Sequence, residues 1–149
     1  MRTVEDILHN KPRPFNFIEP AARVLDALQL MNSVNLSYLV VMHDDTFHGI
    51  FSERDYSRNV ILKGLHSDSC MVKEVMSTDL PIIAPHDTVE HCMQMLNTHK
   101  TRYLLVFDDS HFKAVITIND VLREAISSKG MVFDEQTVMD ATDLQDKVY

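Results

Sequence analysis

The sequence predicts a mixed α/β fold of the α+β type, in which two pseudo-twofold-related repeats each form a small sheet with two packed helices. Three observations lead to this prediction. Residues 17–61 align without a gap with residues 82–126, at a constant shift of 65 positions, which indicates one supersecondary unit used twice. Each copy combines apolar residues at helical spacing with short, continuous apolar runs typical of buried strands. A unit of about 60 residues buries too little surface to stand alone, so the copies are expected to pack sheet to sheet.

The elements of the two copies are expected in the order strand, helix, strand, strand, helix. In the first copy they cover residues 17–18, 20–33, 38–42, 47–51 and 52–64. Pro20 starts the first helical pattern, and Asn32 and Ser33 are its expected stops. The second copy repeats the order over residues 80–84, 89–96, 103–107, 112–116 and 118–127. The segment Ser128-Lys129-Gly130 is expected to end the last helix.

A similar lead-in precedes each copy, at residues 4–8 and at residues 72–76. The two lead-ins are 68 positions apart, so three residues have been gained or lost between lead-in and strand. The expected organisation is therefore a first repeat with its lead-in over residues 1–65 and a second repeat with linker and lead-in over residues 66–128. Residues 129–149 are expected to form an acidic C-terminal tail.

Composition narrows the class of protein. The net charge of −8 opposes non-specific binding to nucleic acids or anionic membranes. No apolar run approaches the roughly 20 residues of a membrane helix, and the N-terminus is not a secretory signal. Three glycines exclude a glycine-rich phosphate loop. Two cysteines, Cys70 and Cys92, form no disulfide framework and are expected to be inert, so a cytoplasmic location is predicted.

The segment Gly49-Ile-Phe-Ser52-Glu-Arg-Asp55 and its partner Ala114-Val-Ile-Thr117-Ile-Asn-Asp120 share a pattern at a strand-to-helix junction. One interpretation is a capping box, in which hydroxyl and carboxylate satisfy free N–H groups of the helix. The other is a ligand site. A helix N-terminus and a hydroxyl can bind phosphate, while an aspartate can accept both hydroxyls of a ribose.

With these motifs, the paired lead-ins and the apolar strands, the chain resembles a tandem CBS (cystathionine β-synthase) domain pair, or Bateman module, of the small stand-alone bacterial type. The resemblance covers about residues 3–127. It departs from the family pattern in two places: the central strands lack the common proline, and Ala114 replaces glycine in the second motif. The resemblance implies two clefts, each able to bind an adenine nucleotide such as AMP, ADP or ATP, an NAD-type dinucleotide or S-adenosylmethionine.

The resemblance also assigns residues to each cleft. Ser52 and Asp55 would serve phosphate and ribose in one cleft, and Thr117 and Asp120 in the other. The base would lie against the lead-in of the opposite copy. The residues at these lead-in positions are Thr3 and Leu8 for the cleft with Asp120, and Met71 and Met76 for the cleft with Asp55.

Four arginines could face phosphate, namely Arg54, Arg58, Arg102 and Arg123. Arg102 precedes the apolar strand of the second copy, where a basic residue often reaches phosphate in the family, whereas the first copy has Ser37. For Arg58 and Arg123, a surface ion pair with the aspartate three residues earlier is the alternative. The eight histidines have no zinc-type spacing with cysteine support, so no metal site is predicted.

The predicted function is a regulatory module that binds an adenosine-containing small molecule and changes its shape or partner affinity in response. It needs no cofactor, is expected to form a homodimer, and acts on a regulated protein that the sequence does not name. No nucleophile, base and acid occur in a catalytic order, so it is not predicted to be an enzyme. The alternative is a ligand-independent dimerisation module whose motifs serve only as helix caps.

Overall fold

A computed structural model describes residues 1–11 and 15–128 of the chain, which divide into two compact units. The continuous segment 15–79 forms one unit, which we call the Asp55 unit. Residues 1–11 and 80–128 form the other, which we call the Asp120 unit. Among the described residues, no helix is both long and apolar enough to cross a membrane.

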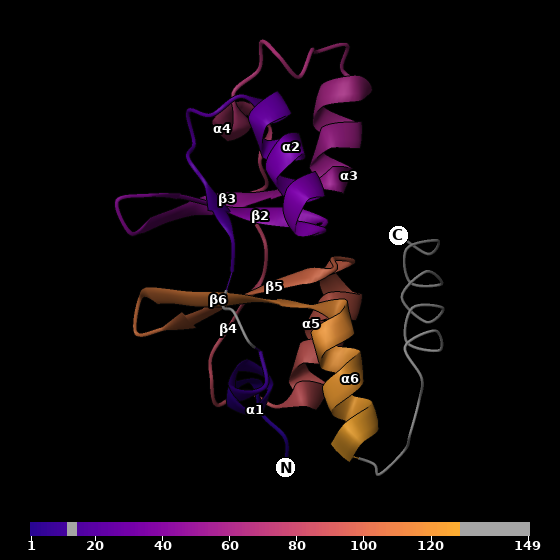
Figure 1. The fold of residues 1–149 in the computed structure, drawn as a ribbon. Coiled ribbons are helices and arrows are strands. Elements are labelled where there is room, and N and C mark those ends of the chain that lie inside the picture. Colours follow the sequence, from indigo (N-terminus) through magenta and orange to yellow (C-terminus); the bar gives the residue numbers. More distant parts are fainter. Residues whose placement is uncertain (12–14, 129–149) are drawn as a thin grey trace. The chain divides into compact units, whose positions relative to one another are not determined.

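The Asp55 unit contains a three-stranded sheet covered by helices on one face (Figure 1). Its strands, in spatial order, are β1 (Phe17–Ile18), β2 (Tyr38–His43) and β3 (Thr46–Ser52). β2 pairs parallel with β1 and antiparallel with β3. The helical elements are α2 (Val24–Val34), α3 (Glu53–Asp55), the π-helical segment η1 (Tyr56–Ile61) and α4 (Val72–Val75). Fully buried Val24, Val41 and Phe51 form the centre of its core.

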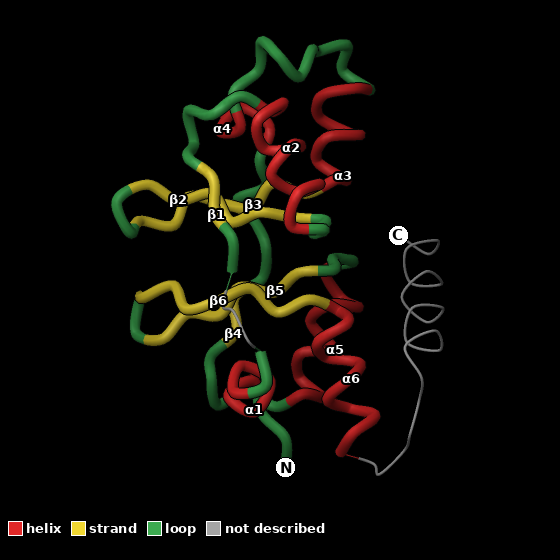
Figure 2. The backbone as a smooth tube through the Cα atoms, in the orientation of Figure 1, coloured by secondary structure: helices red, strands yellow, loops and turns green. Residues whose placement is uncertain are grey.

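The Asp120 unit has the same sheet order. Figure 2 shows its strands in yellow and its helices in red. Its strands are β4 (Ile82–Ile83), β5 (Tyr103–Asp108) and β6 (His111–Thr117). Its helices are α1 (Val4–His9), α5 (Val89–His99) and α6 (Ile118–Ser128). Val4 and Ile7 of α1 are buried in the same core cluster as Leu104 of β5 and Val121 of α6. The first residues of the chain are therefore part of this core.

The 65-residue repeat is confirmed element by element. Each strand, and the first helix of each repeat, begins and ends 65 positions before its counterpart. The hairpins also match: the register shifts between Val41 and Met42 and again between Val106 and Phe107. Both tight turns place two residues at positive φ, Asp44 and Asp45 in one and Asp109 and Ser110 in the other, as a type I′ turn between twisted strands requires.

The ends of two helices differ from those predicted from the sequence. α2 starts at Val24 rather than Pro20, and it continues through Asn32 and Ser33 to Val34. It ends because Asn35 adopts a left-handed conformation, with φ of 55°, a state that asparagine tolerates better than most residues. The helix expected over residues 52–64 ends at Ile61, and its last part is π-helical.

The lead-ins are exchanged between the repeats. α1 precedes the first repeat but belongs to the unit built on the second, where Val4 N–H donates to the Asp87 carbonyl at 2.9 Å. α4 precedes the second repeat but belongs to the unit built on the first, where Val72 N–H donates to the Ala22 carbonyl at 2.8 Å. Each strand-to-helix motif is thus in one unit with the lead-in of the opposite copy, as the family resemblance implies.

Candidate functional site

Ser52 and Asp55 form a complete capping box where β3 passes into α3. The backbone N–H of Ser52 donates to Asp55 Oδ2 at 2.9 Å, and the Ser52 hydroxyl donates to the same oxygen at 3.0 Å. The backbone N–H of Asp55 donates in return to Ser52 Oγ at 3.2 Å. The capping interpretation of the motif is therefore correct for the local structure, and it fixes the carboxylate at the end of the strand.

The second oxygen of Asp55 is held by the lead-in. Ser77 follows α4, and its hydroxyl donates to Asp55 Oδ1 at 2.6 Å. Its backbone forms an antiparallel bridge with Ile50 of β3, with N–O distances of 2.8 and 2.9 Å. Asp55 is only 6% exposed. Burial raises the pKa of Asp55, while its hydrogen bonds from Ser77 and Ser52 act in the opposite direction.

This bridge explains why the first motif begins with glycine. A Cβ atom on Gly49 would lie 2.6 Å from the backbone oxygen of Ser77 and 3.1 Å from Sδ of Met76. No ordinary Cβ contact is that short, so a side chain here would push the lead-in away from β3. Ala114, the counterpart of Gly49, is also buried, and within residues 1–11 and 15–128 no isolated backbone bridge of this kind involves its neighbour Val115.

Thr117 and Asp120 form the corresponding cap where β6 passes into α6. The backbone N–H of Thr117 donates to Asp120 Oδ2 at 2.9 Å, and the N–H of Asp120 donates to Thr117 Oγ1 at 3.3 Å. The backbone carbonyl of Arg102 accepts from Ile118 N–H at 2.9 Å, so the start of β5 lies beside the start of α6. The backbone of Arg102 is therefore next to the strand-to-helix junction that carries Thr117 and Asp120.

In the Asp120 unit the segment that follows the lead-in helix contributes an ammonium group instead of a hydroxyl. Lys11 Nζ forms an ion pair with Asp120 Oδ2 at 2.9 Å and donates to the Val115 carbonyl at 2.8 Å. The side chains of Lys11 and Asp120 are 17% and 14% exposed, so the pair is largely removed from water. Val115 is the counterpart of Ile50, and Lys11 therefore occupies the place that Ser77 takes in the Asp55 unit.

A second carboxylate extends this charged arrangement along α6. Glu124, one turn after Asp120, is 6% exposed. Its partners come from the N-terminal segment: Arg2 Nε lies 3.3 Å from Oε1, and the Asn10 amide donates to Oε2 at 3.5 Å. The counterpart of Glu124 is Asn59, whose amide donates to the Val75 carbonyl at 3.0 Å. The lead-in contacts are thus ionic in one unit and neutral in the other.

The remaining predicted residues are distributed unevenly. Thr3 caps α1, where its backbone N–H and hydroxyl donate to Asp6 Oδ2 at 2.9 and 3.3 Å. Leu8 packs against the core of the Asp120 unit. Met76 packs against the core of the Asp55 unit, and Met71 forms a bridge to Arg23. The arginines differ in exposure: those at positions 54 and 102 are half-buried, and those at positions 58 and 123 are exposed.

Sequence reasoning missed Lys11, Ser77 and Glu124. The signal for Glu124 was present, since an acid four residues after Asp120 on a helix lies on the same face. Lys11 and Ser77 had no such signal, because the lead-ins do not follow the 65-residue shift. Their equivalence arises only from the path of the backbone beside β3 and β6.

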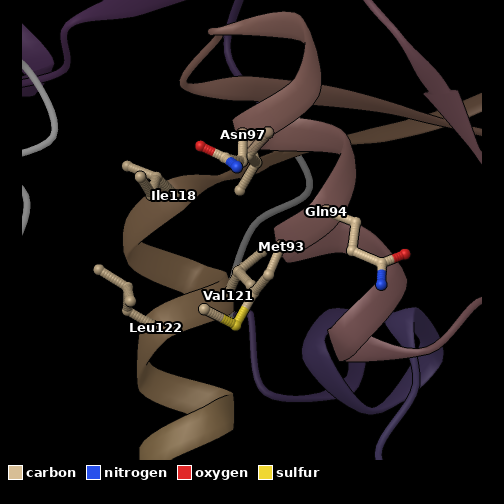
Figure 3. A pocket seen from close by; sticks show the side chains of 7 residues that line it. Met93, Gln94, Asn97, Ile118, Val121 and Leu122 are labelled. Carbon is tan, nitrogen blue, oxygen red and sulfur yellow. The ribbon is translucent and has the colours of Figure 1, made fainter. Parts of the chain in front are cut away.

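An apolar hollow of about 310 Å³ lies between α5 and α6 on the Asp120 unit, with Met93, Ile118 and Leu122 among its lining residues (Figure 3). Neither Thr117 nor Asp120 lines it. It is therefore separate from the capped carboxylate, although Ile118 directly follows Thr117 in the chain.

Both cysteines are buried and unpaired as disulfides. Burial raises the pKa of Cys92 to about 12 and also raises that of Cys70. Because the thiolate is the reactive form, these shifts support the expectation that neither thiol is a nucleophile.

The architecture defines a class: a tandem pair of small α+β repeats, each with a hydroxyl–carboxylate cap at its strand-to-helix junction. The CBS domain family matches residues 4–61 and 72–127. The chain belongs to the CBS domain family, as a tandem pair.

Comparison with known proteins gives relatives at moderate identity. The CBS domain-containing protein CBSX3, mitochondrial, of Arabidopsis thaliana is 31% identical over 108 residues, covering 69% of this chain and 52% of that protein. The chain therefore matches about half the length of this relative. The crystal structure of the CBS domain NE2398 superposes with a TM-score of 0.78 at 32% identity, covering 84% of this chain and 98% of that one. The crystal structure of CBSX2 in complex with AMP gives a TM-score of 0.71 at 27% identity, covering 87% and 99%.

Proposed function

We propose that the chain is a regulatory module that binds an adenine nucleotide at the capped carboxylates Asp55 and Asp120. The observation that carries the proposal is the doubled hydroxyl–carboxylate pair, held in each unit at a strand-to-helix junction. The similarity to CBSX2, whose structure contains AMP, supports an adenosine-containing ligand. The proposal assigns the chain no reaction.

The residues of the Asp120 unit illustrate how such a ligand would be bound. The two oxygens of Asp120 are suited to accept the two hydroxyls of a ribose. Thr117, the first N–H groups of the 11-residue helix α6 and the guanidinium of Arg102 are suited to a phosphate. In the Asp55 unit, Ser52 and Arg54 would have the corresponding roles.

Binding at either carboxylate would disturb the lead-in, and this supplies the regulatory step. Ser77 donates to Asp55 and Lys11 pairs with Asp120, so a ribose hydroxyl competes with a contact that ties the lead-in to the motif. The bound and free states then differ in how the lead-in is held. A ligand shifts such an equilibrium by its difference in affinity for the two states.

The proposal is tested by calorimetric titration with AMP, ADP, ATP, NAD and S-adenosylmethionine. Asp55→Ala and Asp120→Ala should each weaken one binding event by tenfold or more, because the ribose loses a charge-assisted acceptor worth about 1.5–3 kcal/mol. Asp68→Ala and Asp108→Ala remove exposed carboxylates and serve as charge-matched controls. Binding of none of these ligands at millimolar concentration would rule the proposal out.

The alternative, a ligand-independent dimerisation module, is favoured by one observation: both motifs are satisfied as helix caps without a ligand. Under that alternative the two alanine variants lose about 1 kcal/mol of stability but change no affinity. Sedimentation velocity on the same samples would then give one dimer mass with and without nucleotide. In that case a second copy of the chain would cover the apolar hollow between α5 and α6.

A further inference from the structure

We infer that Lys11 is a charge-selecting residue of the Asp120 site, which makes that site favour adenine nucleotides with phosphate over uncharged adenosine and over cationic S-adenosylmethionine. The inference rests on the proposed function and specifies the ligand class of one of its two sites. It follows from an ion pair that the family match does not assign.

Lys11 already occupies the acceptor that a ribose needs. Its ammonium lies 2.9 Å from Asp120 Oδ2 and 2.8 Å from the carbonyl oxygen of Val115. The same Oδ2 also accepts the backbone N–H of Thr117. A ribose hydroxyl that hydrogen-bonds to this oxygen must displace the ammonium.

The displaced ammonium of Lys11 then needs another anion. Lys11 is 17% exposed in the pair, and an ammonium that loses its carboxylate in a poorly hydrated place is unfavourable unless another anion replaces it. Glu124 does not serve, because Arg2 and Asn10 already contact it. A ligand that brings its own anion compensates for the exchange.

The contacts of Asp120 Oδ2 indicate where that anion would lie. Lys11 Nζ and the backbone N–H of Thr117 both contact Asp120 Oδ2, so a 5′-phosphate bound at Thr117 and the start of α6 would lie near the ammonium. The four-carbon stem of lysine lets the ammonium move from carboxylate to phosphate without moving the backbone. Adenosine offers no charge there, and S-adenosylmethionine places a sulfonium on the same 5′ carbon.

The Asp55 unit is an internal comparison, because its lead-in carries no cation at this place. Ser77 donates a neutral hydroxyl to Asp55 at 2.6 Å, and Asn59 contacts the lead-in through an amide. A ribose that displaces the Ser77 hydroxyl leaves no buried charge. Selection by phosphate is therefore expected at Asp120 and not at Asp55.

The test isolates the Asp120 site in an Asp55→Ala background and measures the dissociation constants of ATP, AMP and adenosine by calorimetry. Lys11→Met keeps the stem and removes the charge. It is expected to weaken ATP binding and to strengthen adenosine binding, so that the ratio of the two affinities falls by tenfold or more. Lys11→Arg should keep the ratio, and Lys113→Met, which changes an exposed lysine of β6, should leave it unchanged.

The outcomes separate this inference from the proposed function. Suppose that adenosine and ATP both bind while Lys11→Met changes the two affinities by the same factor or changes neither of them. That result overturns charge selection and leaves the nucleotide site in place. If the parent protein binds no adenine compound, both are overturned. Lys11→Gln gives a second neutral variant should Lys11→Met fail to fold.

Acetylation of the ligand-free protein, followed by mass spectrometry, tests the ion pair itself. Lys11 should react slowly in the parent protein and faster in Asp120→Ala, and equal rates would contradict the ion pair.

Discussion

Asp55 is a carboxylate whose surroundings work against its charge. It is 6% exposed, and its hydrogen bonds come from hydroxyl groups and one backbone N–H rather than from a cation. Burial is the largest influence and raises the pKa of Asp55 above its ordinary value of 3.8. A charged Asp55 therefore lowers the stability of the folded protein relative to a neutral one.

The raised pKa of Asp55 makes the free energy of unfolding depend on pH. Because the pKa of Asp55 is higher in the folded state, the folded state binds its proton more tightly, and the free energy of unfolding falls as pH rises from 3.8 through the raised pKa. Asp55→Asn has no such titration and can still accept from Ser52. Urea unfolding at several pH values should show this variant gaining stability relative to the parent across that window, and then staying level. A difference that is constant with pH would contradict the burial effect.

The residues of the motifs could be predicted, because Ser52 and Asp55 recur as Thr117 and Asp120 at one constant shift. Their partners could not. The side chain that meets each carboxylate comes from a lead-in outside the constant shift, and its identity depends on where the backbone passes. For the same reason, the sequence distinguished the two sites by Arg102 but not by Lys11.

At the scale of elements, a close backbone approach constrains the pairing of Ser77, which follows α4, with β3 in the Asp55 unit. Gly49 permits the backbone of Ser77 to approach β3. Gly49→Ala is expected to lower the free energy of unfolding by about 1–3 kcal/mol, because the methyl group meets backbone rather than a flexible side chain.

Ala114→Gly is the matched change in the other unit. It should cost less, about 0.5–1 kcal/mol, because glycine adds backbone freedom to the unfolded chain without relieving a clash. Chemical denaturation of both variants measures the difference. Equal losses, or a more stable Gly49→Ala, would contradict the close approach of the lead-in.

The strands were predicted within a residue or two because their apolar runs are short and bounded by turns. The helix ends were harder to predict. α2 passes two residues that favour turns and stops only where Asn35 turns left-handed, and Lys100 does the same after α5, although lysine carries no signal for that conformation. Nothing in the sequence indicated that η1 would be π-helical. The matching part of α6, 65 positions later, is a regular α-helix.

At the scale of the whole molecule, the exchange of lead-ins makes one unit continuous in sequence and the other discontinuous. Removal of residues 1–11 takes away α1, with buried Val4 and Ile7, and the ionic partners of Glu124 and Asp120. Hydrogen exchange should then report lost protection in β6 and α6, while β3 and α2 keep theirs. Equal loss in both units would mean that they unfold as one body.

The repeat itself was the strongest prediction for the whole molecule, because an ungapped 65-residue shift over most of the chain leaves few other architectures. The exchange of lead-ins entered only through the family resemblance. Periodicity and composition do not predict which copy each lead-in packs against, because α1 and α4 present similar apolar residues to similar cores.

The discontinuity of the Asp120 unit also orders events during translation. A ribosome delivers residues 15–79 as one uninterrupted stretch, so the Asp55 unit can fold while the rest of the chain is still being made. The N-terminal segment must wait, because Lys11 and its acceptor Val115 are 104 positions apart. We expect a nascent chain to complete the neutral carboxylate site first and the charged one only after Val115 and Asp120 have been made.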